Sequence, residues 1–116
     1  MSKRRRASGK PVPPSNLIEV HRDPTPGVWY VSLTRREVRE AFGAALKIAR
    51  GTTTVTQEEL AERADIDVSY ASMLERGTRS PNLYVLIKLG LALDVAPELL
   101  IAMTLARLRD GMEVLP

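Results

Sequence analysis

The stretch of the chain from residue 56 to residue 77 places the strongest constraint on the fold, because it reads as two short helices joined by a tight turn. Thr56 is a good N-cap, and Glu59 three residues later completes a capping box, so a helix is expected to begin at Gln57. The expected inner face of this helix is formed by Leu60, Ala61 and Ala64.

A second short helix is expected directly after this turn. Ile66 supplies an apolar residue inside the turn, and Asp67 can cap a helix that runs from about Val68 to Arg76. Gly77 offers the residue with positive φ that ends such a helix. Two helices in this arrangement have the geometry that lets the second enter a DNA groove, so DNA binding is the leading functional hypothesis.

Three more helices are predicted around this pair. Thr34 and Glu37 form another capping box, which starts a helix over about residues 35–50 that is expected to stop at Gly51. Asn82 caps a helix that continues to about residue 93. Pro97 suits the first turn of a last helix, expected to reach residue 109 before Gly111 ends it. The predicted fold is therefore all-α, with five helices over residues 35–110.

The composition bounds the class of protein. A chain of 116 residues with 44% apolar content and few aromatic side chains can form one small core of aliphatic residues, which suits helix packing. The absence of cysteine excludes disulfides and thiolate metal sites. The single histidine, His21, has only Asp23 beside it as a second ligand type and is read as a surface residue. No metal and no cofactor are expected.

The N-terminal part differs from the helical part. Residues 1–16 are expected to be a disordered basic tail, with five basic residues and no acidic residue among the first ten. The remaining chain holds 12 basic and 14 acidic residues, so the body is not generally basic. Residues 17–34 are expected to be extended, because two β-prone runs flank the turn signal of residues 23–27. They form either a small hairpin or extended segments docked on the helices.

Charged residues interrupt the longest apolar runs, near residues 83–93 and 99–108, so neither is expected to span a membrane. The basic N-terminus has no apolar segment behind it, which argues against a secretion signal. A soluble, cytoplasmic protein is expected.

The segment from about Phe42 to Leu100 resembles the lambda-repressor-like, Xre/Cro-type helix-turn-helix family. The matching elements are Phe42-Gly, Leu46-x3-Arg50, Thr56-Gln-Glu-Glu-Leu-Ala61, Ser69-Tyr-Ala-Ser72, Leu74-Glu-Arg-Gly77, Pro81, Leu86-x2-Leu89, Leu93-x-Val95 and Glu98-Leu-Leu100. They cover roughly half of the chain. The resemblance implies a five-helix DNA-binding domain that commonly acts as a dimer on a palindromic site.

The resemblance also implies which residues meet DNA. The helix from Val68 to Arg76 looks like the recognition helix, with Ala71 and Leu74 facing the core. The side chains expected to face the base edges are Val68, Ser69, Ser72 and Met73. Those expected to hold phosphates are Gln57, Arg76, Arg79 and Asn82. The base-facing positions hold no Arg, Asn or Gln, and Asp65 and Asp67 add negative charge, which leaves DNA shape, Arg79 and the tail as further sources of specificity.

Arg50 and Glu75 match a buried or half-buried ion pair of the family, and a structural role is expected for them rather than a catalytic one. Glu58, Glu59 and Glu62 are read as a solvated helix face. Nothing in the chain resembles a catalytic constellation or a glycine-rich phosphate loop, so no enzyme is expected.

The sequence thus predicts a sequence-specific transcriptional regulator, a repressor that binds a palindromic operator in double-stranded DNA as a dimer. Apolar residues surround both of the last two expected helices, and pairing of these helices in a homodimer would cover the surplus. The alternative is an antitoxin or protein-interaction adaptor that uses the same fold to bind a protein partner.

Overall fold

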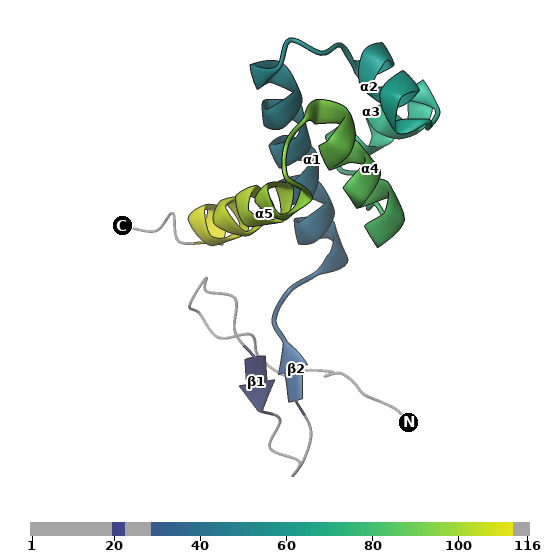
Figure 1. Cartoon of the computed structure of the whole chain (residues 1–116). Coiled ribbons are helices and arrows are strands. Elements are labelled where there is room, and N and C mark those ends of the chain that lie inside the picture. The colour runs from purple at the N-terminus through teal and green to yellow at the C-terminus, as the bar shows by residue number, and fades with distance from the viewer. Residues whose placement is uncertain (1–19, 23–28, 113–116) are drawn as a thin grey trace.

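The computed structural model describes residues 20–22 and 29–112 of the chain. These residues form a short two-stranded sheet followed by five helices (Figure 1). The elements in chain order are β1 (Val20–Arg22), β2 (Trp29–Val31), α1 (Arg35–Thr52), α2 (Gln57–Ala64), α3 (Val68–Arg76), α4 (Leu83–Leu93) and α5 (Pro97–Met112). The prediction of an all-α domain of five helices is confirmed. The predicted tail of residues 1–16 lies outside the described residues.

Polar side chains fix the starts of α1, α2 and α4, as predicted. At α2 the Thr56 hydroxyl accepts a hydrogen bond from the Glu59 backbone N–H at 3.1 Å, and the Glu59 carboxylate accepts one from the Thr56 N–H at 2.8 Å. This bond from the Thr56 N–H lowers the pKa of Glu59. Thr34 and Glu37 make the same capping box at α1, and the Asn82 side chain accepts from Val85 at α4.

Three details of the helix ends differ from the prediction. Helix α1 continues through Gly51, because the hydroxyls of Thr52 and Thr53 bond to the carbonyls of its last turn and the left-handed residue is Thr54, at φ 58°. Helix α5 likewise continues through Gly111 to Met112. A glycine weakens a helix without ending it unless the chain takes positive φ there. Asp67 occupies the N-cap position of α3 but makes no side-chain capping bond.

The core lies where the five helices meet. Its largest buried side chains are leucines, each with less than 2% of its surface exposed, contributed by every helix: Leu46, Leu60, Leu74, Leu89, Leu93 and Leu100. The predicted inner face of α2 is buried, and Ile66 in the following turn packs against the core as expected. A single aliphatic core therefore holds both helices of the 56–77 segment in place.

The two strands form an antiparallel hairpin that stands apart from the helices (Figure 1). Val20 pairs with Val31, His21 with Tyr30 and Arg22 with Trp29. Of the two alternatives from the sequence, the described residues take the hairpin. The first strand begins at Val20, and residues 17–19 lie outside the described part of the chain.

Helices α4 and α5 each bury one stripe and leave other apolar side chains in solvent. In α4 the side chains of Leu83, Tyr84 and Leu91 are 67–71% exposed, and in α5 Leu99 is 50% exposed. Among the described residues, none of the helices combines the length and the apolar character needed to cross a bilayer.

Candidate nucleic-acid interface

Helix α3 presents one face to the core and another to solvent. Ala71 and Leu74 are completely buried, as predicted. On the outer side Val68 is 44% exposed, Ser69 is exposed, and Ser72 and Met73 are half-buried. The Ser72 hydroxyl accepts a hydrogen bond from the Arg76 guanidinium one turn later. The four predicted base-facing residues thus lie on the accessible part of α3, with Ser72 tied to Arg76.

The packing of α3 against α1 depends on the absence of a side chain at Gly43. A Cβ atom at this position would lie 2.5 Å from the carbonyl oxygen of Leu74 and 2.6 Å from that of Glu75. Both oxygens belong to the backbone of α3, so they cannot move aside as a flexible side chain would. The distance between α1 and α3 is therefore set by direct contact of their backbones at Gly43.

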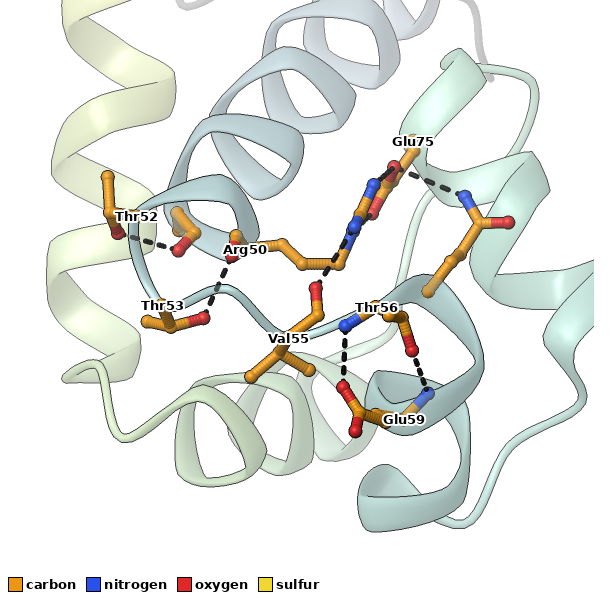
Figure 2. Close-up of polar contacts among 9 residues, drawn as sticks. Arg50, Thr52, Thr53, Val55, Thr56, Glu59 and Glu75 are labelled. Atoms are coloured by element: carbon orange, nitrogen blue, oxygen red, sulfur yellow. Dashed lines mark hydrogen bonds and ion pairs between the residues drawn. The ribbon is translucent and has the colours of Figure 1, made fainter.

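An ion pair ties the end of α1 to the end of α3 (Figure 2). The Arg50 Nε donates to one Glu75 carboxylate oxygen at 2.6 Å, and Nη2 donates to the other at 3.0 Å. The Glu75 side chain is 4% exposed and that of Arg50 is 20% exposed. These hydrogen bonds raise the pKa of Arg50. The pair expected from the sequence is present in a bidentate, largely buried form.

Two further contacts extend this pair to the start of α2. The Arg50 Nη1 donates to the Val55 carbonyl oxygen at 3.0 Å, which holds the loop between α1 and α2. The Gln57 side-chain amide donates to a Glu75 carboxylate oxygen at 3.2 Å. Gln57, the predicted phosphate contact at the N-terminus of α2, is thus already oriented by a residue of α3, and the two helices are held in a fixed relation.

Cationic side chains flank the exposed face of α3. Arg76 and Arg79 are exposed, and the Arg79 guanidinium lies over the Tyr70 ring, 5.9 Å from its centre. Asn82 is exposed, but its side-chain oxygen is used to cap α4, which leaves its amide N–H groups for a ligand. The predicted phosphate contacts after α3 therefore lie together at the loop between α3 and α4.

Sequence reasoning missed two residues that support this loop. Arg39 of α1 donates to the Gly77 carbonyl oxygen at 3.1 Å, just where α3 ends at φ 78°. Tyr70 is half-buried against the core and provides the ring beneath Arg79. No signal in the sequence pairs Arg39 with a carbonyl 38 residues away. A tyrosine inside the helix expected to read DNA could have been noticed as a platform for a nearby arginine.

The acidic residues at the turn between α2 and α3 occupy two different places. Asp65 is the left-handed residue that ends α2, at φ 55°, and its carbonyl oxygen accepts a hydrogen bond from Lys88 of α4 at 3.5 Å. Asp67 is exposed at the N-terminus of α3. A carboxylate at a helix N-terminus interacts favourably with the helix dipole, so Asp67 stabilises α3 even without a capping bond. Asp67 therefore adds negative charge at the start of α3, and the exposed Asp65 adds a second one in the turn before it.

The sequence of this helical region is similar to the sequences of known proteins. A family model described as helix-turn-helix matches residues 46–100. An HTH-type transcriptional regulator of Mycobacterium tuberculosis, itself termed uncharacterized, is 38% identical over 58 residues. The match covers 50% of this chain and 41% of that relative, so the chain corresponds to about two fifths of the relative's length.

Solved structures show the same similarity in three dimensions. The clp gene regulator ClgR from Corynebacterium glutamicum is 32% identical with a TM-score of 0.60, covering 61% of this chain and 76% of that one. The restriction-modification controller protein C.AhdI from Aeromonas hydrophila is 38% identical with a TM-score of 0.52, covering 53% and 92%. With the five-helix fold and the α2–turn–α3 unit, these matches show that the chain belongs to the lambda-repressor-like, Xre-type helix-turn-helix family.

Proposed function

We propose that the protein is a transcriptional regulator that binds double-stranded DNA through α3 and represses from a palindromic operator as a dimer. The observation that carries this proposal is the exposed face of α3, held by a buried ion pair and flanked by Arg76, Arg79 and Asn82. A rigid helix with small polar side chains outward and cations at its end suits the major groove. The function consists of binding and requires no reaction.

The first test separates base readout from phosphate binding. Ser72→Ala and Val68→Ala are expected to change which bases are preferred, at about 1–3 kcal/mol for each base interaction removed, because these side chains face the base edges. Arg79→Ala is expected to weaken binding to all sequences alike, because it holds a phosphate. Gln57→Ala should do the same. Titration of each variant against selected and scrambled DNA measures both effects, and neutrality of all four variants would show that the assigned face is wrong.

The second test concerns the homodimer. The exposed apolar side chains of α4 and α5 form a surface that a twofold pairing would cover, and such pairing would place two α3 helices about 34 Å apart, one DNA turn. Sedimentation at micromolar concentration is expected to give a dimer. Leu91→Asp, at a position 71% exposed, is expected to shift the protein toward monomer without lowering its melting temperature as a monomer. A monomer of 12.8 kDa for the unaltered chain, with and without DNA, contradicts this part of the proposal.

The adaptor or antitoxin function is the second candidate, and the exposed Leu83, Tyr84 and Leu91 favour it. In that case the same surface would bind a different protein. The adaptor function would be favoured over the regulator function if the protein formed a stable one-to-one complex with a protein partner and bound no DNA from a random pool.

A further inference from the structure

Hydrogen bonds fix the backbone of the loop between α3 and α4 at both of its ends. The Gly77 N–H donates to the Leu74 carbonyl oxygen at 3.2 Å. The N–H and the hydroxyl of Thr78 both donate to the Met73 carbonyl oxygen, at 3.0 and 3.1 Å. The side-chain cap of α4 fixes the other end of the loop. Arg79 therefore extends from a backbone that is already held, and only the direction of its long side chain remains to be set.

The ring of Tyr70 lies where it can set that direction. Tyr70 belongs to the first turn of α3, is half-buried and packs against the core. The guanidinium of the exposed Arg79 lies over this ring, 5.9 Å from its centre. A cation in such a place is attracted to the electron-rich face of the ring. The core thus holds the ring, and the ring attracts the arginine.

This contact leaves the hydrogen-bonding groups of Arg79 available to a ligand. A guanidinium carries five N–H donors, and its attraction to a ring requires none of them. The Arg50 side chain shows the opposite case, because all three of its guanidinium nitrogens donate to acceptors within the protein. A planar cation with available donors matches the geometry of a phosphate group.

Tyr70 and Glu75 lie on opposite borders of the outer face of α3. Successive residues are about 100° apart around a helix axis, so these two positions are about 140° apart, with the buried face of the helix between them. At one border Glu75 orients Gln57 through a hydrogen bond of 3.2 Å. At the other border Tyr70 carries Arg79. A helix in the major groove runs between the phosphates of two strands, so an oriented donor on each border suits both strands.

We propose that Tyr70 is a positioning residue for DNA binding, whose ring holds the Arg79 guanidinium ready for a phosphate on its border of α3. The inference rests on the proposed function and adds to it a residue that acts through another side chain. An exposed arginine samples many rotamers, and a complex that has to immobilise it loses affinity. The ring removes part of this loss before DNA arrives.

A double-mutant cycle in the full chain measures this role. Tyr70→Leu is expected to weaken binding to selected and scrambled DNA alike by about three- to tenfold, which corresponds to the ordering of one long side chain. In an Arg79→Ala background the same substitution is expected to have no further effect, because the arginine that the ring orders is absent. Tyr70→Phe, which keeps the ring, is expected to retain the affinity that Tyr70→Leu loses.

The cycle also separates the ordering of Arg79 from a loss of packing, since Tyr70 contacts the core. A displaced α3 would weaken binding in every background equally, whereas the proposed role affects only chains that contain Arg79. The matched cycle uses Arg36→Ala, which removes an exposed cation of α1, and there the two effects are expected to be additive. Equal effects of Tyr70→Leu with and without Arg79, or an equal loss in Tyr70→Phe, would overturn the proposal.

The free protein offers a measurement that requires no DNA. Protons held over an aromatic ring are shifted upfield in NMR spectra by the ring current. The side-chain protons of Arg79 are therefore expected to be shifted upfield in the unaltered chain and to lose this shift in Tyr70→Leu. If the chain binds no DNA, the proposed function fails, while these shifts still decide whether the ring holds Arg79. Random-coil positions for these protons in the unaltered chain would overturn the proposal even if DNA is bound.

Discussion

Gly43→Ala is expected to lower the free energy of unfolding by about 3 kcal/mol, at the upper end of the cost of overpacking a core. The added methyl group would meet two backbone carbonyl oxygens of α3 at 2.5 and 2.6 Å, and relieving this overlap requires α1 and α3 to separate. The higher helix propensity of alanine returns only ~1 kcal/mol. Chemical denaturation measures the loss, and DNA affinity is expected to fall with it because α3 is displaced.

Gly51→Ala is the matched control within the same helix. A Cβ atom at Gly51 would meet nothing within 4 Å, so only the difference in helix propensity remains and the variant is expected to gain about 0.5–1 kcal/mol. Opposite signs for the same substitution at these two positions would show that the approach of α3 decides the outcome. Equal effects at both positions would contradict the close contact of α1 with α3.

Arg50→Met is expected to lower the free energy of unfolding by about 3–5 kcal/mol, because it leaves the carboxylate of Glu75 buried and without its cation. Glu75→Leu is expected to cost less, since the Arg50 side chain is 20% exposed and can turn toward water. In the double variant Arg50→Met with Glu75→Leu, much of the loss is expected to be recovered, because no unpaired charge remains.

The exposed pair of Arg36 and Glu40 provides the control for this series. Its side chains are 78% and 56% exposed, so Arg36→Met is expected to change the free energy by no more than about 1 kcal/mol. Denaturation curves of the four variants and a double-mutant cycle measure the coupling. If Arg50→Met lowered the free energy of unfolding no more than Arg36→Met does, burial of the Arg50–Glu75 pair would not contribute to stability.

Much of the fold could be predicted because its local signals agree with one another. The capping boxes at Thr34 and Thr56 each place two reciprocal hydrogen bonds within four residues, and such signals need no knowledge of distant contacts. The burial of Ala71 and Leu74 follows from helical periodicity. The C-terminal ends of α1 and α5 could not be predicted in the same way, because a helix can either continue through a glycine or end at it.

The candidate site was only partly predictable, for a related reason. Its frame depends on pairs far apart in the chain, such as Arg39 with the Gly77 carbonyl, and no local pattern encodes them. The Arg50–Glu75 pair was expected from the family resemblance, but the bond from Gln57 to the same carboxylate was not. The roles of Val68, Ser69, Ser72 and Met73 toward DNA stay predictions.

The carboxylate of Glu75 joins three helices through one side chain, with Arg50 of α1 and Gln57 of α2 both bound to it. Opening α3 alone would separate this buried charge from the cation that it binds. Local unfolding of this helix therefore approaches the free energy of global unfolding, and its backbone amides should be among the slowest in the domain to exchange hydrogen with solvent. If α3 enters the DNA groove, as proposed, it does so already ordered, and no free energy of binding is lost to folding this helix.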